Sequence, residues 1–325
     1  MTVADLVNKI EFTNHQCVNK VTYSNNYVTF YPIRKLTFTG YKLPMKKSFL
    51  VLNIIVIALL FSCKRNENID TKKEPIIRNQ PKSVSYQSEN AKEWLSLNSK
   101  DAKKLRIAVA VNRTDKENFA QMDSVIMPID MTGDLEYYLP FPMSVPYLKD
   151  IDKIIYFSYP TQTFATYEKG ELIYTGPTNM GRKQDQTPTG LFYANWKAEE
   201  TTSTFNDEWD LRWNFNVENL LGVGWHQYSL PGYPASHSCM RLQEKDARYL
   251  YEWADQWVLT DNDSILVKGT PVIVFGSYDF NAPKPWMRLI DNPKALDITV
   301  AEMENQTKHF LKDILAEQGN RVVKG

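Results

Sequence analysis

Two histidines and a cysteine stand close together in a chain that uses both residue types sparingly. The stretch GWHQYSLPGYPASHSCMRL, residues 224–242, places His226, His237 and Cys239 within 14 positions, although the whole chain has four histidines and three cysteines. A thiol is strongly nucleophilic only as the thiolate, and at its ordinary pKa of about 8.5 it needs a base or a cation nearby. The spacing therefore predicts a cysteine nucleophile assisted by histidine.

Each of the three residues also has a structural interpretation. A lone cysteine can pack as a small, inert hydrophobic residue, and a single histidine often has a purely structural role. The residues flanking Cys239 are polar, however, which argues against an inert thiol. In an extended segment His237 and Cys239 would point to the same face, and the turn-rich loop SLPGYPAS can bring His226 back beside them. Together the three residues favour catalysis.

The order of these residues resembles the signature of YkuD-type L,D-transpeptidases. That signature is a histidine, a loop, then Ser/Thr-His-Gly-Cys, a hydrophobic residue and Asn or Arg. In this chain the order is His226, then Ser236, His237, Ser238, Cys239, Met240 and Arg241. Ser238 replaces the usual glycine, and the loop before Ser236 is shorter than is common. Because serine is less free than glycine at positive φ, we expect the backbone there to differ slightly.

The resemblance implies a peptidoglycan acyltransferase. In this family the cysteine attacks the carbonyl of the third residue of a tetrapeptide stem and expels the terminal D-alanine. An amine of a neighbouring stem takes the acyl group, which gives a 3→3 cross-link, whereas water as the acceptor gives a carboxypeptidase. By this resemblance Cys239 is the nucleophile, His226 is the general base, and His237 orients the site with a second proton role open to it.

The same resemblance assigns the polar residues around the thiol. Backbone N–H groups near Ser238 and Cys239 would hold the developing oxyanion, and Ser236 would help to shape the site. Arg241 would bind a substrate carboxylate or fix the loop. Two histidines and a cysteine can ligate zinc, but the motif lacks a fourth ligand and the family uses no metal. No metal or other cofactor is implied.

The elements that must position these residues lie in about residues 151–276, the expected catalytic domain. The resemblance implies a mainly β fold with helices, a YkuD-like β-sandwich preceded by a small α+β region and followed by a C-terminal helix. IDKIIYFSYPTQTFATYEKGELIYTG predicts two strands joined by a turn at Glu168, Lys169 and Gly170. QTPTGLFYANWK resembles the family's turn and following strand, and GTPVIVFG predicts a short buried strand.

Two helical patterns complete the domain and its C-terminal extension, residues 277–325. Apolar residues at helical spacing predict a core-facing helix: Ala247, Leu250, Tyr251, Ala254, Trp257 and Val258. Thr299 and Glu302 form a capping box that predicts the start of another helix. Its apolar face would be formed by Met303, Phe310, Leu311, Ile314 and Leu315.

Residues 96–150 predict a small region ahead of the catalytic domain. KLRIAVAVNRTDKENFAQMDSVIMPID, residues 104–130, indicates a strand, a short helix from about Lys116 and a strand ending at Pro128. This order faintly resembles LysM, a small βααβ peptidoglycan-binding module. A layer that packs on the catalytic domain is an equal alternative.

The N-terminal part indicates export and lipid anchoring. MKKSFLVLNIIVIALLFSC from Met45 has a basic start, a short apolar run and a cysteine, so residues 45–62 predict a lipoprotein signal peptide and Cys63 the lipidated residue. Residues 1–44 are interpreted as a disordered, wrongly included leader, and residues 63–95 as a flexible tether. Lys64 after the cysteine favours a location at the outer membrane, facing the periplasm.

The composition limits the classes of partner that the protein is expected to bind. Lys and Arg total 38, as do Asp and Glu, so no net charge points to nucleic acid. The expected partners are peptidoglycan stem peptides and, through the anchor, a membrane; the oligomeric state stays open. The loop of residues 228–235 and the segment NDEWDLRWNF can shape an acceptor groove. Two rivals to the transpeptidase remain, a carboxypeptidase or related hydrolase on the same scaffold and a non-catalytic, wall-binding lipoprotein.

Overall fold

The computed structural model describes residues 21–24, 27–30, 76–202 and 210–324. The chain divides into two compact units, Met1–Glu74 and Pro75–Gly325. In the first unit, strand β1 (Val21–Ser24) pairs antiparallel with β2 (Tyr27–Phe30), so these residues of the expected leader form a strand pair instead of being disordered. Both strands are rich in β-branched and aromatic residues, which favour this conformation. The predicted signal peptide and Cys63 lie outside the described residues.

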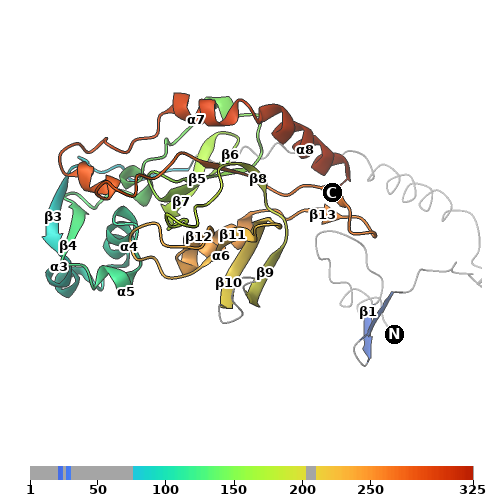
Figure 1. Cartoon of the computed structure of the whole chain (residues 1–325), viewed down its shortest axis with the longest axis horizontal. Helices are drawn as coiled ribbons and strands as arrows, with labels where there is room; N and C mark the ends of the chain where they lie inside the picture. The colour runs from blue at the N-terminus through green and yellow to red at the C-terminus, as the bar shows by residue number, and fades with distance from the viewer. Residues whose placement is uncertain (1–20, 25–26, 31–75, 203–209, 325) are drawn as a thin grey trace, which may run out of the picture. The chain divides into compact units, whose positions relative to one another are not determined.

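A five-stranded sheet forms one layer of the second unit (Figure 1). Its order is β7-β6-β5-β15-β8, and β15 runs parallel to β5 while the other neighbours are antiparallel. The strands are β5 (Ile154–Ser158), β6 (Thr163–Glu168), β7 (Glu171–Pro177), β8 (Gly190–Tyr193) and β15 (Pro271–Phe275). Residues of β5 are buried on both faces, because Ile155 and Phe157 enter one core while Ile154 and Tyr156 enter another.

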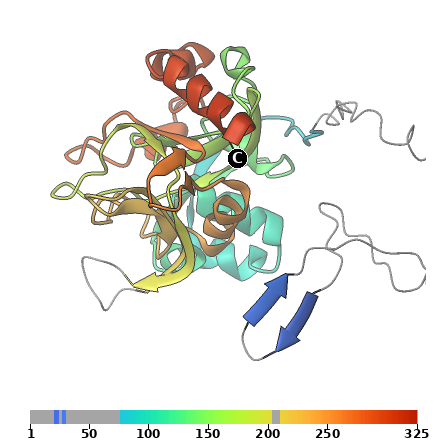
Figure 2. The ribbon, with the colours of Figure 1, turned by 90° about the vertical axis from the view of Figure 1, so that its right-hand side faces the viewer.

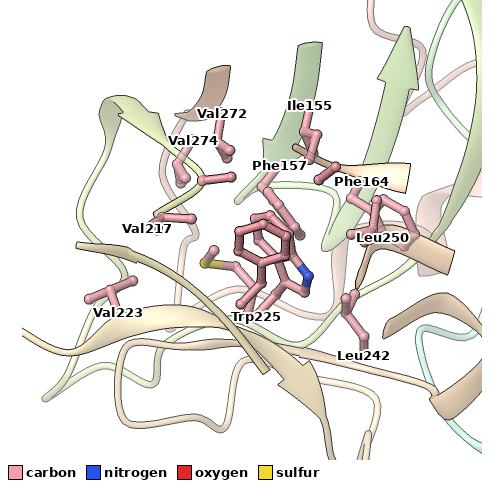
Figure 3. Packing of buried hydrophobic residues seen from close by; sticks show 14 of the residues in the cluster. Ile155, Phe157, Phe164, Val217, Val223, Trp225, Leu242, Leu250, Val272 and Val274 are labelled. Carbon is pink, nitrogen blue, oxygen red and sulfur yellow. The ribbon is translucent and has the colours of Figure 1, made fainter. Parts of the chain in front are cut away.

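A four-stranded sheet forms the second layer, in the order β12-β11-β10-β9. Its strands are β9 (Lys197–Thr202), β10 (Asp210–Glu218), β11 (Val223–Gln227) and β12 (Met240–Leu242). Phe157 and Phe164 of the first sheet pack against Trp225 and Leu242 of the second, together with helix α6 (Glu244–Trp253) (Figure 3). This shared core confirms the predicted mainly β sandwich with helices.

Helix α6 contains only part of the apolar pattern that predicted a core-facing helix. Ala247 and Leu250 are buried within the helix, as expected for its core-facing side. The helix ends at Trp253, however, and Trp257 and Val258 lie beyond it, with Val258 in strand β13 (Val258–Leu259). Strand β14 (Ile265–Val267) pairs antiparallel with β13. Helical spacing of apolar residues therefore continued past the true end of the helix.

The turn between β6 and β7 forms at the predicted residues. Lys169 and Gly170 have φ angles of 49° and 83°, as a two-residue hairpin with two left-handed residues requires. A Cβ on Gly170 would lie 2.5 Å from the carbonyl oxygen of Val145, so a larger residue would clash there. The hairpin turn predicted at Glu168, Lys169 and Gly170 is confirmed.

The outer face of the five-stranded sheet is covered by the C-terminal segment, which appears in red in Figures 1 and 2. Thr299 accepts a hydrogen bond from the Glu302 backbone N–H (3.1 Å), which confirms the predicted cap of helix α7 (Val300–Thr307). A single helix was predicted, but a second one, α8 (Leu311–Lys324), follows it. The backbone N–H of Phe310 bonds to the Thr307 carbonyl (2.9 Å), a tight turn that separates the two helices.

Residues 86–128 form a region of two strands and three helices. They are β3 (Tyr86–Asn90), α3 (Ala91–Asn98), α4 (Ala102–Val111), α5 (Lys116–Phe119) and β4 (Ser124–Pro128), and β3 pairs antiparallel with β4. The short helix from Lys116 and the strand ending at Pro128 agree with the prediction. The order is strand, three helices, strand, which is one helix more than the βααβ order of LysM, and a peptidoglycan-binding role for this region stays a prediction.

Two predictions about this region were wrong. The strand predicted from Lys104 is helix α4, which begins after Asp101, whose side chain accepts from the Lys104 N–H (3.0 Å). A short apolar run buried on all sides does not reveal its period, so strand and helix are hard to distinguish there. The tether expected over residues 63–95 does not extend through residues 86–95, which belong to β3 and α3.

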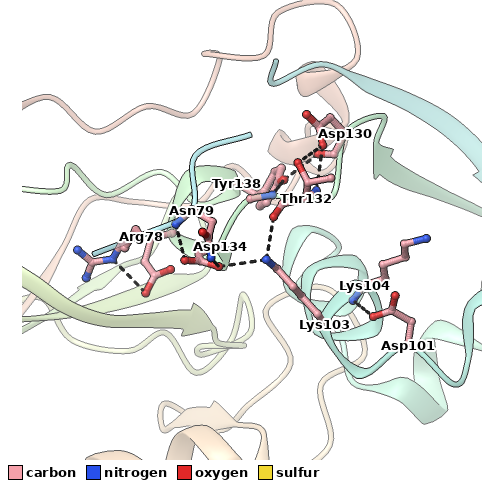
Figure 4. A network of polar contacts seen from close by, with 11 residues as sticks. Arg78, Asn79, Asp101, Lys103, Lys104, Asp130, Thr132, Asp134 and Tyr138 are labelled. Carbon is pink, nitrogen blue, oxygen red and sulfur yellow. Dashed lines mark hydrogen bonds and ion pairs between the residues drawn. The ribbon is translucent and has the colours of Figure 1, made fainter. Parts of the chain in front are cut away.

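Polar contacts also hold residues 78 and 79 against this unit (Figure 4). The backbone N–H of Asn79 donates to Asp134 (2.7 Å), and Arg78 lies 3.4 Å from a carboxylate oxygen of Glu136. Lys103 of α4 bonds to the same Asp134 (3.1 Å). Low hydrophobicity predicted a tether here, but specific polar partners order the segment. The remaining short helices are η1 (Leu135–Tyr138), η2 (Pro146–Leu148) and η3 (Pro285–Leu289).

Within the described part of the chain, every helix is too short or too polar to cross a membrane.

Candidate active site

Strands β11 and β12 place the motif residues on one face. His226 and Arg241 are direct partners in this parallel pair, and Trp225 and Met240 are the preceding partners. Because successive side chains in a strand point to opposite faces, Trp225 and Met240 enter the core while His226 and Arg241 face away from it. The core thus fixes the orientation of both polar side chains.

A cavity of about 140 Å³ lies on that face. Five of the predicted site residues line it: His226, Ser236, His237, Cys239 and Arg241. Ser238 is not among its lining residues. The structure therefore brings the predicted residues of the motif to one place, although their chemical roles stay predictions.

Cys239 lines this cavity and is partly buried. Its Sγ donates to the carbonyl oxygen of Gly222 at 3.7 Å. Burial raises the pKa of the Cys239 thiol, against smaller lowering effects of a backbone hydrogen bond from Gly224 and the charge of Arg241. The thiol is therefore protonated at neutral pH and needs a proton acceptor to become a nucleophile.

His226 has the properties of that acceptor. Its Nδ1 lies 3.1 Å from the carbonyl oxygen of Gln227, and because a carbonyl oxygen only accepts, Nδ1 carries the proton and Nε2 has the free lone pair. The side chain is 5% exposed, and burial lowers the pKa of His226 to about 4. The imidazole is thus neutral above this pH.

Ser238 adopts the backbone conformation that a glycine would take. Its φ is 77°, in the left-handed region, where a side chain costs about 1 kcal/mol. The hydroxyl donates to the carbonyl oxygen of His237. The segment from His237 to Cys239 is not extended as predicted, because Ser238 has a left-handed φ, but both side chains line the same cavity. Burial, followed by the charge of Arg182, lowers the pKa of His237.

Residues 178–182 form hydrogen bonds with residues 236–241, which carry the motif, and the sequence did not identify them as part of the site. Thr178 Oγ1 donates to the Arg241 carbonyl (2.9 Å), and the backbone of Asn179 exchanges two hydrogen bonds with that of Arg241, each 3.1 Å. The Ser236 N–H donates to the Met180 carbonyl (3.1 Å), and the Ser236 hydroxyl donates to the Cys239 carbonyl. No local pattern marks residues 178–182, because their partners lie about 60 positions away.

Strands β9 and β10 and the residues next to them also line the cavity. These lining residues are Trp196, Thr201, Thr202, Leu211, Asn214, Asn216 and Asn219. The segment NDEWDLRWNF had been predicted to shape a groove, and Leu211 and Asn214 of that segment do line the cavity. The amide side chains were not singled out from the sequence, since isolated Asn residues carry no motif.

No group of three or more His, Cys, Asp or Glu residues in the described ranges is arranged to hold a metal ion.

Residues 152–274 match the family model of YkuD, the L,D-transpeptidase catalytic domain. The bounds of this match are close to those of the predicted domain, residues 151–276. No protein of curated function matched the sequence.

Among solved structures, the chain is similar to three L,D-transpeptidases. The protein from Stackebrandtia nassauensis is 24% identical over 39% of this chain and 57% of its own, with a TM-score of 0.32. The protein from Mycobacterium smegmatis is 22% identical over 39% of this chain and 59% of its own, with a TM-score of 0.31. The protein from Mycobacterium tuberculosis H37Rv is 20% identical over 39% of this chain and 58% of its own, with a TM-score of 0.31. The match thus spans less than two thirds of each of these proteins.

Proposed function

We propose that this chain is a peptidoglycan L,D-transpeptidase that forms 3→3 cross-links through a cysteine thioester. The observation that supports this most directly is one cavity, within the residues that match the YkuD model, that is lined by a partly buried thiol, a neutral imidazole and a guanidinium. In this proposal Cys239 attacks the carbonyl of the third stem residue, and the terminal D-alanine leaves. A stem amine then attacks the thioester and releases the thiol.

The protonation states indicate how the thiol is activated. Burial raises the pKa of Cys239 above its ordinary value and lowers that of His226 to about 4. The neutral thiol and imidazole are therefore favoured over a thiolate–imidazolium pair in the free protein. Proton transfer to Nε2 of His226 would then accompany attack on the carbonyl, with the backbone N–H groups near Ser238 and Cys239 holding the oxyanion.

Arg241 is suited to recognise a substrate carboxylate. Its guanidinium carbon lies 4.4 Å from the centroid of the Tyr228 ring, which orients it from one side. Within the described residues no Asp or Glu forms an ion pair with it. A cation that is partly desolvated and has no acidic partner gains most from a carboxylate ligand. In the proposal this ligand is a carboxylate of the stem peptide.

Transfer rather than hydrolysis needs a bound acceptor. Water is present at about 55 M, whereas a well-oriented amine can reach an effective molarity of about 10⁵ M, so positioning decides the outcome. A carboxypeptidase remains the alternative if the acceptor is not held. A decayed, non-catalytic site is less well supported, because Ser238 keeps the left-handed φ that the motif glycine would adopt.

Purified protein incubated with tetrapeptide muropeptides tests the proposal. Mass spectrometry of the products should show 3→3 linked dimers, with tripeptide monomers as a minor product. Tripeptide as the sole product would indicate a carboxypeptidase, and no turnover would favour the non-catalytic alternative. A carbapenem should acylate the wild type and give no mass gain in Cys239→Ala.

We also propose that the protein is anchored by lipid at Cys63 and faces the periplasm from the outer membrane. The basic, apolar and cysteine segments of residues 45–63 support this, as does Lys64 after the cysteine. Mass spectrometry of membrane-extracted protein should find Cys63 as a lipidated N-terminus. Recovery of peptides from residues 1–44 in the mature protein would contradict the proposal.

A further inference from the structure

A second, larger cavity adjoins the candidate active site. It has a volume of about 720 Å³ and lies between helices α4 and α5 and the start of α6. Tyr228 lines both this groove and the catalytic cavity. The Tyr228 ring lies 5.8 Å from that of His226, centroid to centroid, in an edge-to-face arrangement. A ligand in the groove is therefore separated from the candidate base by one side chain.

One wall of the groove is formed by α4 and α5, which lie outside residues 152–274. Hydrogen bonds join the start of α5 to the loop of residues 228–235. Asp115 accepts from the Leu230 N–H (2.7 Å), and Thr114 Oγ1 donates to the Leu230 carbonyl (2.8 Å). Asn118 donates to the hydroxyl of Ser229 (2.8 Å). These bonds join the start of α5 to the residues that directly follow Tyr228. The groove is thus preformed, which lowers the entropy cost of binding.

The groove presents charges of both signs. Lys116 and Glu117 of α5 and Lys245 of α6 line it and are exposed. None of these three forms an ion pair within the described residues. Lipid headgroups and nucleic acids would favour one sign, whereas a peptide that carries both amine and carboxylate groups matches this mixture. The smaller cavity that holds Cys239, by contrast, is lined by uncharged amide side chains from β10 and the residue after it, and amides suit a peptide backbone.

We propose that this groove binds the acceptor stem peptide, while the amide-lined cavity holds the donor. The inference rests on the proposed transpeptidase function and names the place of its second substrate. The acceptor's neutral amine forms a C–N bond at the thioester carbonyl as the C–S bond breaks. The proton that the amine loses is taken up by His226 and returned to the sulfur of Cys239, so the free thiol is restored.

Charge reversal in the groove tests this assignment. The variant Lys116→Glu/Lys245→Glu is compared with wild type in a transfer assay with a tetrapeptide donor and a tripeptide stem as acceptor, since the tripeptide cannot serve as donor. The apparent KM for the tripeptide should rise by about tenfold or more. Lys149→Glu/Lys312→Glu makes the same charge change at exposed residues that line neither cavity, and it should leave this KM at the wild-type value.

Calorimetry separates this inference from the proposed function. Binding of the tripeptide stem to Cys239→Ala should weaken when the two groove substitutions are added, whether or not the wild type forms cross-links. If the wild type forms none but binding depends on the groove lysines, the function is wrong and the groove stands. An unchanged KM and an unchanged binding constant in the groove variant would overturn the acceptor site.

Discussion

At the scale of single residues, burial determines the chemistry of the candidate site. His226 is almost fully buried, and this keeps its imidazole neutral across the physiological range. The same environment keeps the Cys239 thiol protonated. The pair is thus expected to be unreactive until a substrate is bound, which would protect a lone thiol from oxidation.

The pH dependence of stability should report the state of His226. Its pKa is about 4 in the folded protein and about 6.5 in an unfolded chain, so below pH 6.5 the unfolded state binds the proton first. The free energy of unfolding should therefore fall as the pH drops from about 6.5 to about 4, by about 3 kcal/mol in total. Denaturant unfolding of wild type and His226→Gln at several pH values checks this. An equal pH dependence in both proteins would contradict it.

Removal of the base should abolish both products of the reaction. His226→Ala is expected to lower the rate of Cys239 acylation by a carbapenem about 10² to 10⁴-fold, because the proton of the thiol loses its acceptor. The measurement is the time course of the mass gain. Acylation at the wild-type rate in His226→Ala would show that another group is the base.

The substitution Arg241→Ala should mainly raise the apparent KM for the stem peptide.

The left-handed φ of Ser238 leads to a matched pair of substitutions. Ser238→Gly removes the strain of a side chain at this φ but gains unfolded-state entropy, so its free energy of unfolding should stay within about 1 kcal/mol of wild type. Ser238→Val should lower it by more than about 1 kcal/mol, because a β-branched residue is poorly tolerated there. Chemical denaturation measures both. A stable Val variant would show that the backbone at this position can relax.

At the scale of elements, a buried ion pair joins helix α4 to helix α6. Arg106 contacts both carboxylate oxygens of Asp246, whose side chain is fully buried. The Tyr174 hydroxyl of β7 donates to the same carboxylate (2.7 Å). The charge of Arg106 therefore compensates a carboxylate that lies between the N-terminal helices and the catalytic domain.

Breaking this pair on one side should be costly. Arg106→Met leaves Asp246 buried without a cation, and the expected loss of unfolding free energy is about 3 to 5 kcal/mol. Arg106→Met/Asp246→Leu should recover much of that loss, because an apolar pair of similar size needs no compensation. Thermal and urea denaturation of the three proteins tests this. A double variant less stable than the single one would show that the pair is net stabilising.

At the scale of the whole molecule, the segments on the two sides of residues 152–274 share a hydrophobic core with each other. Tyr86, Ile107 and Ile126 pack with Trp286 and Leu296 in one hydrophobic cluster. Arg113 is fully buried and donates to the Thr161 carbonyl (2.8 Å) at the start of the catalytic domain. The described part of the second unit therefore forms one cooperative structure rather than a domain on a tether.

Truncation should reveal this dependence. A chain that begins at residue 76 should have the same melting temperature as the full chain, since it retains every described contact of the second unit. A chain that begins at residue 132 loses β3, β4 and α3–α5 and exposes the apolar faces that packed on them, so we expect it to be unfolded or aggregated. Circular dichroism melting and proteolysis measure both, and a cooperative melt of the shorter chain would contradict the shared core.

The sequence alone determined the features that depend on neighbouring residues. The order of His226, Ser236, His237 and Cys239 identified the family resemblance and the candidate site. The turn at Lys169 and Gly170 and the cap at Thr299 follow from conformational preferences and hydrogen bonds within a few residues. Such local energies act in the same way wherever the segment lies in the molecule, so they can be predicted from the sequence.

Only the tertiary structure decided the features that depend on distant partners. Residues 102–111 are helical and their second half, residues 107–111, is buried, although the apolar run is equally consistent with a strand. The anchors Thr178 and Asn179 and the groove of α5 meet the motif only after the chain folds. Their hydrogen bonds and burial join residues more than 60 positions apart, and a single sequence carries no local signal for contacts at that distance.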